Sequence, residues 1–398
     1  MTSQIVLMNG FGVAIASDSA VTMGDRSRTY DTADKIVGLP APHRIAVLHS
    51  GYVEIGNVPY SVLLAEWSRQ LPDKPLRTAE AYQRHFIDWL GNNPDWFGER
   101  FQRDLVYEIL WERAERIGSI VKESSENEEF SLDELLGQWI KEVEALPRQN
   151  GITSSSAKKL LENFDEMVTY IIDQNISADV LNDETRPRIT RYFTEFLACD
   201  YVFKASLVFC GYGEREVLPS WTRADFTGFM DDQLVWSPGD SFEFGADTNP
   251  AFSISLPAQR TAIDQYLRGY EYPLIEMIPE AAIRGTHDFL TEALRDTDLT
   301  EGQQDTVIQL LTRAEEKVSE SVWEMVRNYS EENYVSKLRW AIASLPPGSL
   351  IDVARSLIEI QALRQTTTAQ LNTVGGPIDV ALISPDEGFR WVRHKSIG

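Results

Sequence analysis

The sequence predicts a layered α/β sandwich in which helices cover the faces of β-sheets. Strand-type segments gather near the two ends of the chain and around residue 210, and two long stretches with helical periodicity separate them. The order strands, helices, strands, helices, strands requires that distant strands share sheets, which is typical of layered α/β folds. We expect one domain over residues 1–398, with its sheet core at 1–60, 204–257 and 369–398 and helical insertions at 61–203 and 258–368.

The first fifty residues predict two antiparallel strand pairs. Apolar residues at 5–8 and 12–17 flank Asn9-Gly10, a dipeptide that favours the tight turn of a β-hairpin. A second pair is expected at residues 35–38 and 44–49. Four residues of interest then lie at strand ends: Thr2, Asp18, Lys35 and Gly51.

Two helical blocks and two later strand sets follow. The turn at Ser50-Gly51 is expected to start a helix near Val53. The first block predicts amphipathic helices at 79–90, 100–121, 132–146 and 157–172, with the polar run 122–129 as a solvated loop. Strands are expected at 205–210, 217–220, 226–236 and 241–245. A second helical block at 258–365 precedes Gly375-Gly376 and a closing hairpin at 378–383 and 389–392.

Composition excludes several classes of function. The formal net charge of -24 disfavours nucleic acid and anionic membrane as partners, because both are bound through neutralising Lys and Arg. Cys199 and Cys210 are too few for a disulfide framework or a zinc site, and we expect core thiols. No cofactor or metal is expected, since the five histidines form no ligand pair at helical spacing. Without a recognisable leader or membrane span, the expected location is cytoplasmic.

Thr2 follows Met1 directly, and removal of Met1 would make it a nucleophile that carries its own base. A free α-amine, with a reference pKa of about 8, can take the proton of the neighbouring hydroxyl directly or through a water. No histidine is then required. The structural alternatives are that small residues commonly follow the initiator, that Asp18 and Lys35 form only an ion pair, and that His49 beside Ser50 is a strand-end residue rather than a base.

The chain resembles the proteasome β-subunit family and the HslV-like peptidases, which are N-terminal nucleophile hydrolases. The residues that carry the resemblance are Thr2, the segment 12–24, Lys35-Ile36, Ser50-Gly51 and Gly375-Gly376. The similarity covers roughly the first 60 residues, residues 204–245 and the last 25, whereas the helical blocks are longer than those of the family. It implies a four-layer αββα sandwich with two enlarged helical insertions.

The resemblance also implies a role for each strand-end residue. Thr2 is the nucleophile, and its amine is the general base. Lys35 lies beside it and favours the alkoxide, Asp18 holds Lys35 charged and oriented, and the N–H of Gly51 stabilises the oxyanion. Where the family has an aspartate and a serine before the late glycines, this chain has Asn372 and Thr373.

Three functions follow from these expectations. The first is a threonine-type peptidase or amidohydrolase that uses Thr2 on a peptide or amide substrate. The second is a catalytically inactive, proteasome-like structural subunit, and the third is a hydrolase of a small-molecule amide. The resemblance implies a homo-oligomer, and the enlarged helical blocks predict a dimer or another assembly that differs from a plain stacked ring.

Overall fold

The computed structural model describes residues 2–22, 29–30, 33–124, 131–202, 204–245, 248, 252–258, 260–295, 301–368 and 375–395. The fold is mixed α/β with antiparallel sheets. Contacts divide the chain into two compact units. The first unit holds Met1–Thr2, Ala33–Phe244 and Ala381–Val392, and the second holds Ser3–Thr32, Gly245–Val380 and Arg393–Gly398. The single domain expected from the sequence stays a prediction.

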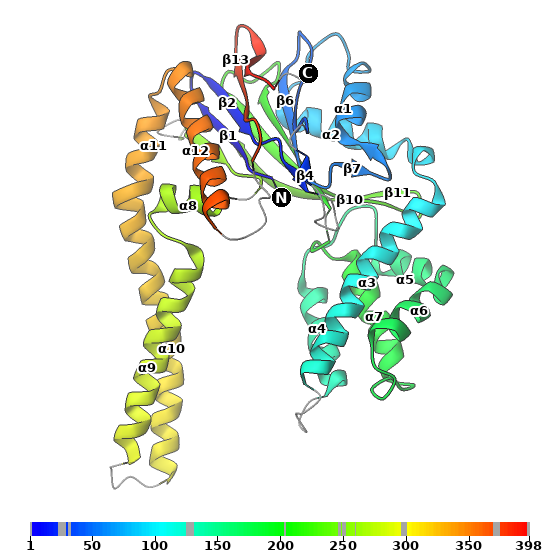
Figure 1. Ribbon diagram of the computed structural model, residues 1–398, viewed down its shortest axis with the longest axis vertical. Helices are drawn as coiled ribbons and strands as arrows, with labels where there is room; N and C mark the ends of the chain where they lie inside the picture. Colours follow the sequence, from blue (N-terminus) through cyan, green and yellow to red (C-terminus); the bar gives the residue numbers. More distant parts are fainter. Residues whose placement is uncertain are drawn as a thin grey trace. The chain divides into compact units, whose positions relative to one another are not determined.

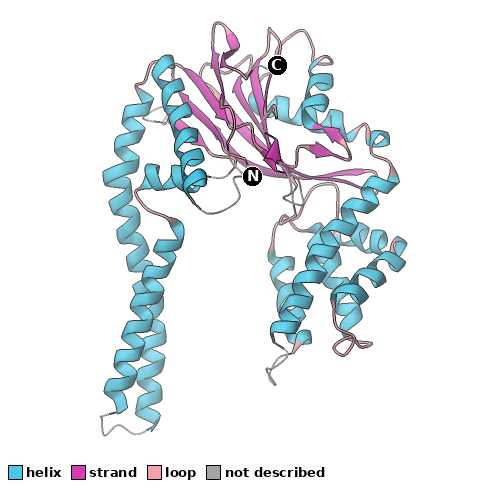
Figure 2. Ribbon diagram, viewed as in Figure 1, coloured by secondary structure: helices cyan, strands magenta, loops and turns pink. Residues whose placement is uncertain are grey.

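The first unit contains a five-stranded antiparallel sheet with the order β11-β10-β9-β6-β5. Its strands are β5 (Ile36–Gly38), β6 (Arg44–Gly51), β9 (Ala205–Tyr212), β10 (Ser220–Met230) and β11 (Gln233–Glu243). A small hairpin of β7 (Glu54–Ile55) and β8 (Val58–Pro59) follows β6. Figure 2 shows the strands of this sheet in magenta.

Two helices cover one face of this sheet, and five more follow in the chain. The helices are α1 (Tyr60–Ser68), α2 (Ala79–Gly91), α3 (Glu99–Glu123), α4 (Leu132–Ala145), α5 (Ser154–Asn163), α6 (Asp165–Asn175) and α7 (Thr185–Ala198), with a short 3-10 turn at Pro94–Trp96. Trp67 of α1 and Phe86 of α2 pack edge-on or tilted against Phe209 of β9, with ring centroids 6.0 and 5.8 Å from it. Thr78 caps α2, because its hydroxyl accepts the N–H of Ala81 at 3.1 Å.

Helices α3 to α7, which lie close together in Figure 1, enclose a second apolar core of the first unit. Ile109 and Leu110 of α3, Leu136 of α4 and Phe193 of α7 are buried in it. Gly118 lies in the middle of α3, where a Cβ would overlap the carbonyl oxygen of Asn175 at the end of α6. The two helices therefore approach each other closely only because this position lacks a side chain.

The second unit contains the strands β1 (Gln4–Asn9), β2 (Gly12–Ser17) and β12 (Phe252–Ser255), which pair antiparallel in the order β12-β1-β2. Its helices are α8 (Thr261–Arg268), α9 (Tyr272–Arg295), α10 (Glu301–Ser330), α11 (Ser336–Ala343) and α12 (Pro347–Thr367), with a π-helical turn at Glu331–Val335. The strands bury Ile5 and Leu7 against Leu357 and Ile358 of α12. Helices α9 and α10 run antiparallel as a long hairpin (Figure 1).

Shorter strands complete the list: β3 (Val21–Thr22) pairs with β4 (Thr29–Tyr30) in the second unit. The predicted closing hairpin corresponds to the strands β13 (Asp379–Ser384) and β14 (Gly388–Arg393), which hold residues of both units. Among the described residues, no helix is both long and apolar enough to cross a membrane.

Several predicted elements are wrong in detail. The helix expected near Val53 begins at Tyr60, because the β7–β8 hairpin comes first. The helix expected at 157–172 is broken at Phe164, whose φ of -108° and ψ of 26° separate α5 from α6. No strand forms at 217–219.

The single strand expected at 226–236 covers the end of β10, a two-residue turn and the start of β11. Asp231 and Asp232 form this turn with φ values of 50° and 58°. Two consecutive residues with positive φ are typical of the type I′ turn, which matches the twist of antiparallel strands. The polar run expected as a loop at 122–129 begins within α3, and its residues 125–129 lie outside the described part of the chain.

Replacing Gly118 tests the close approach of α3 and α6. Alanine is the better helix former, yet we expect Gly118→Ala to lower the free energy of unfolding by about 1–3 kcal/mol, because its Cβ overlaps the Asn175 carbonyl. Gly137→Ala in α4 is the matched control, since no atom lies within 4 Å of its added Cβ. We expect it to raise the free energy of unfolding by up to about 1 kcal/mol. Urea denaturation followed by circular dichroism measures both, and a stabilising Gly118→Ala would contradict the contact.

Candidate active site

Asp18 and Ser3, the residue after Thr2, lie side by side at the open end of the β1–β2 hairpin. Gln4 pairs with Ser17, and beyond this pair the N–H of Asp18 donates to the carbonyl of Ser3 at 3.1 Å. The N–H of Ser3 donates in return to Oδ1 of Asp18 at 2.9 Å. Asp18 thus fixes the peptide bond that joins Thr2 to Ser3. Thr2 is 8% exposed and belongs to the first unit, whereas Asp18 belongs to the second.

The late glycines also reach Asp18 within the second unit. The N–H of Gly375 donates to Oδ2 of Asp18 at 3.2 Å, so each carboxylate oxygen accepts a backbone N–H. Ser19 donates its N–H to the Gly375 carbonyl at 3.2 Å and its hydroxyl to the Pro377 carbonyl at 2.7 Å. Gly375, the first of the two late glycines in the sequence resemblance, therefore contacts Asp18 and Ser19 directly. Met1, Asn372 and Thr373 lie outside the described residues.

Lys35 and Gly51 lie at one end of the β5–β6 strand pair in the first unit. Ile36 pairs with Leu48, and the carbonyl of Lys35 accepts the N–H of His49 at 3.1 Å. Lys35 is 2% exposed, which is rare for a lysine, because burial of an ammonium requires compensating partners. Thr2, Lys35 and Gly51 are thus three predicted site residues that share the first unit.

Gly51 has the backbone geometry that only glycine adopts without strain. Its φ is 83°, and a Cβ on it would overlap the carbonyl oxygen of Lys204. The N–H of the next residue, Tyr52, donates to the same carbonyl at 2.8 Å. A side chain at position 51 would therefore separate β6 from β9 at this end of the sheet.

His49 is a buried, neutral residue beside Lys35. Its Nε2 lies 2.8 Å from the carbonyl oxygen of Asp34, and this acceptor requires that Nε2 carry the hydrogen. Burial lowers the pKa of His49 from 6.5 to about 4. Nε2 is therefore occupied by a structural hydrogen bond, which matches the strand-end interpretation of His49 rather than the base.

The sequence did not reveal a row of buried polar side chains across the first unit's sheet. Ser50, Ser206, Asp225 and Ser237 lie directly opposite one another on β6, β9, β10 and β11. Directly opposed residues share a face of the sheet, and alternation places this face away from the side packed on α1 and α2. The Ser206 hydroxyl donates to Asp225, and burial raises the pKa of that carboxyl. The row ends at Ser50, next to Gly51.

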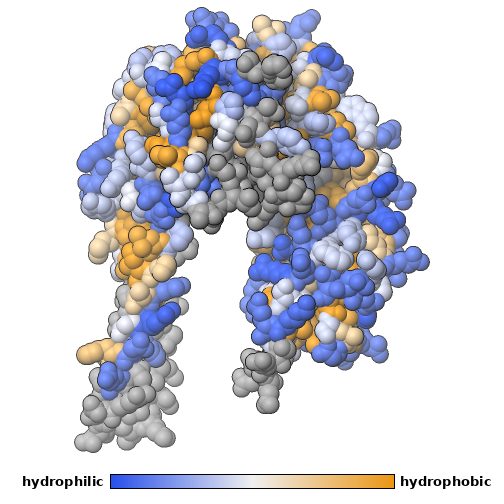
Figure 3. Space-filling model, in the orientation of Figure 1, coloured by the Kyte–Doolittle hydropathy of each residue, from blue (hydrophilic) through white to orange (hydrophobic). Residues whose placement is uncertain are grey.

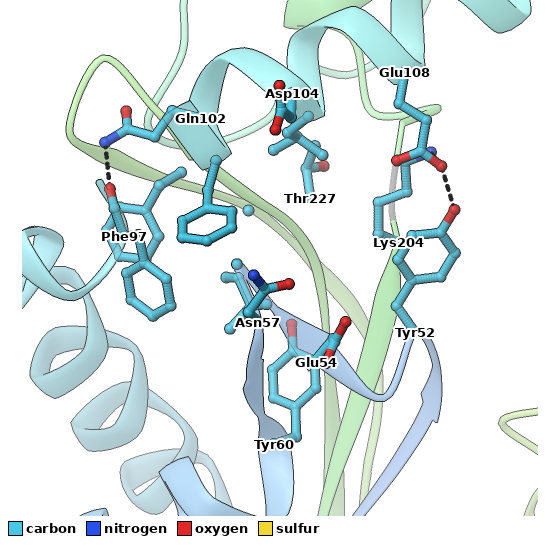
Figure 4. Close-up of a pocket in the computed structure, with 16 residues that line it drawn as sticks. Tyr52, Glu54, Asn57, Tyr60, Phe97, Gln102, Asp104, Glu108, Lys204 and Thr227 are labelled. Carbon is cyan, nitrogen blue, oxygen red and sulfur yellow. Dashed lines mark hydrogen bonds and ion pairs between the residues drawn. The ribbon is translucent and has the colours of Figure 1, made fainter. Parts of the chain in front are cut away.

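A pocket of about 190 Å³ opens beside Gly51, also in the first unit (Figure 4). Its lining comes from the β7–β8 hairpin, α3 and the ends of β9 and β10. The residues are Tyr52, Glu54, Ile55, Gly56, Asn57, Tyr60, Phe97, Phe101, Gln102, Asp104, Leu105, Glu108, Lys204, Thr227, Gly228 and Phe229. Most of them fall in two segments, 52–60 and 97–108, and no pattern in the sequence shows that these segments meet each other and the strand residues 227–229.

Comparison with known proteins gives no matching family model and no matching curated protein. The function proposed below is therefore argued from the residues of this chain alone.

The buried histidine makes stability depend on pH. Because the pKa of His49 is about 4 in the folded state and 6.5 in the unfolded state, protonation favours unfolding. The contribution is fully present above pH 6.5 and is lost as the pH falls towards 4, at a total of about 3 kcal/mol. Urea titrations at several pH values should show a smaller loss between pH 6.5 and 4.5 for His49→Gln than for wild type. Equal losses would contradict the buried neutral state.

Proposed function

We propose that the chain is a threonine-type N-terminal nucleophile hydrolase that cleaves peptide or amide bonds with Thr2 after removal of Met1. The observation that carries the proposal is the hydrogen bond from the Ser3 N–H to Asp18 at 2.9 Å. It fixes the peptide bond that follows the proposed nucleophile Thr2. A fixed geometry of the attacking group speeds attack on a bound carbonyl. The Gly375 N–H on the other oxygen of Asp18 supports the same role.

In the proposed reaction, the α-amine of Thr2 takes the proton of the Thr2 hydroxyl as Oγ attacks the substrate carbonyl. The C–N bond then breaks, the amine returns the proton to the leaving nitrogen, and an ester on Thr2 remains. A water molecule, deprotonated by the same amine, hydrolyses this ester. The charge of the buried Lys35 favours a neutral amine and an alkoxide, and the N–H of Gly51 is the proposed oxyanion donor.

The proposal includes the finer fold: a four-layer αββα sandwich with two helical insertions in one domain. It is supported by the strands of each unit, which pack one face against helices, α1 and α2 in the first unit and α8 and α12 in the second. A cytoplasmic location belongs to the same proposal.

A homo-oligomer is part of the proposal as well. Helix α9 exposes Leu274, Met277 and Phe289 at 56%, 62% and 69%, and α10 exposes Met325 at 70%. Figure 3 shows apolar surface on the described part of this helical hairpin. Large apolar side chains gathered on a projecting helix pair are typical of surfaces that pack against another chain.

The nucleophile can be tested by labelling. We expect intact mass and N-terminal sequencing of native protein to show Thr2 as the first residue, and a β-lactone or epoxyketone probe to add one adduct to it. Thr2→Ala should lose at least about 99% of labelling and hydrolysis, because the substitution removes the attacking oxygen. Thr306→Ala, on the exposed face of α10, is the matched control and should label as wild type does.

The outcomes of this experiment separate the three candidate functions. A retained Met1 overturns the catalytic proposal, because Thr2 then has an amide in place of an amine. A processed chain that takes no label favours the inactive structural subunit. Labelling with turnover of small amides but not of peptides favours the small-molecule hydrolase.

Light scattering tests the assembly. At micromolar concentration we expect a mass that is a multiple of the single chain, and a monomer would contradict the proposal. The paired substitution of Leu274 and Met277 by Glu should shift the mass towards the monomer, because a charge cannot be buried unpaired in an apolar contact. Glu280→Gln, exposed on the same helix, is the control and should leave the mass unchanged.

A further inference from the structure

The pocket begins one residue after the proposed oxyanion donor. Tyr52 follows Gly51 and lines the pocket, and its N–H is bonded to the carbonyl of Lys204, another lining residue. A substrate carbonyl held at Gly51 would place the adjoining part of the substrate at this opening. With about 190 Å³, the pocket is smaller than the roughly 300 Å³ of the smallest drug-sized sites, so it suits one side chain or a small head group.

Five aromatic residues are among the sixteen that line the pocket. Phe97 and Phe229 stack with ring centroids 4.5 Å apart and an interplanar angle of 17°. Phe101 and Tyr60 complete this wall, and Figure 4 shows the Tyr60 hydroxyl directed into the open centre. Aromatic faces attract apolar stems and cations alike, because the ring face carries partial negative charge.

Carboxylates outnumber cations in the lining. Glu54, Asp104 and Glu108 are present, and Lys204 is the single cation among the lining residues. The Lys204 ammonium lies 3.5 Å from Glu108 and 3.8 Å from Glu112, so two carboxylates already neutralise it. Glu54 forms no ion pair with any residue that the structure describes. The negative charge of the pocket is therefore not balanced from within.

Tyr60 adds a polar atom that the protein leaves unused. The residue is 2% exposed, yet its hydroxyl has no hydrogen-bond partner among the described residues. Burial raises the pKa of Tyr60, so the hydroxyl stays protonated and offers lone pairs to a donor. Because no described residue bonds to this oxygen, a ligand that supplies a donor can bind it without breaking a hydrogen bond within the described part of the protein.

We propose that this pocket binds a cationic side chain, a guanidinium or an ammonium on an apolar stem, next to the bond that Thr2 cleaves. Glu54 is the charge partner, the Tyr60 hydroxyl accepts an N–H, and Phe97, Phe101 and Phe229 enclose the stem. The proposal rests on the proposed hydrolase function for its place beside the reacting carbonyl. The net charge of -24 acts in the same direction, because it concentrates cationic substrates around the protein.

Binding can be measured without catalysis. Full-length Thr2→Ala protein is titrated calorimetrically with Nα-acetyl-arginine N-methylamide and with the citrulline analogue, which has the same shape but no charge. We expect the arginine compound to bind about tenfold more tightly, the difference that one hydrogen bond to a charged group brings. The difference should shrink as salt is raised, since screening weakens attraction between partly exposed charges.

Variants assign the preference to the pocket. Glu54→Gln should reduce the arginine-to-citrulline ratio about fivefold, and Tyr60→Phe should weaken arginine binding while leaving the fold intact, because its hydroxyl bonds to no described residue. Glu115→Gln is the matched control, as it removes an exposed charge from α3 outside the pocket lining. It should leave the ratio unchanged.

The results distinguish this proposal from the proposed function. Equal affinities for the arginine and citrulline compounds, or a ratio that Glu115→Gln changes as much as Glu54→Gln does, overturn the cation pocket even where Thr2 is labelled. Arginine binding that depends on Glu54 in a chain whose processed Thr2 takes no label supports the pocket and overturns the hydrolase. Tighter binding of a glutamate analogue than of the arginine compound also overturns the pocket.

Discussion

The buried carboxylate of Asp18 is the constraint on which the N-terminal end of the chain depends. With 1% of its surface exposed, Asp18 has exchanged water for other hydrogen-bond donors, and a buried carboxylate without donors would be strongly destabilising. The N–H groups of Ser3 and Gly375 are two of these donors, and they come from chain positions more than 350 residues apart. Satisfying one charge therefore fixes the N-terminal strand and the late glycines together. The peptide bond between Thr2 and Ser3 is held in place by this requirement.

In the first unit, the end of the β5–β6 strand pair is held by backbone hydrogen bonds and by the conformation of Gly51. Lys35 and Gly51 lie at one end of the β5–β6 pair. There His49 donates its backbone N–H to the Lys35 carbonyl and its ring Nε2–H to the Asp34 carbonyl. Gly51 lets β6 approach the Lys204 carbonyl, so the strand reaches its last residue without leaving the sheet. One face of this sheet is apolar and packs on helices, and the other face carries the row from Ser50 to Ser237. This row thus lies on the face of the sheet that is directed away from α1 and α2.

Elements that depend on neighbouring residues in the sequence were predicted well. The first hairpin forms as expected, although its two-residue loop is Gly10-Phe11 and Asn9 pairs with Gly12. The helix predicted from residue 79 begins at Ala79 as α2, and the strands expected at 35–38 and 44–49 form β5 and β6. Two errors have different causes. The β7–β8 hairpin has a local signal that the prediction missed, since Gly56-Asn57 forms its turn with φ values of 53° and 66°. The break at Phe164 interrupts an unbroken amphipathic pattern, and tertiary packing decides it. Of the site, residues at strand ends could be predicted, but the Ser206–Asp225 pair depends on strand registers that the sequence does not contain.

Helix α3 explains why the long insertion matters to the proposed site. Its buried stripe, with Val106, Ile109 and Leu110, faces the core of α3 to α7. A second stripe with Phe101, Asp104, Leu105 and Glu108 has the same helical spacing and lines the pocket beside Gly51. Deleting α3 would therefore remove part of the pocket wall that, in our proposal, selects the substrate. In the proposed function, chemistry and selection then come from different parts of the chain: Thr2 and Lys35 lie at strand ends, whereas α3 supplies part of the pocket wall.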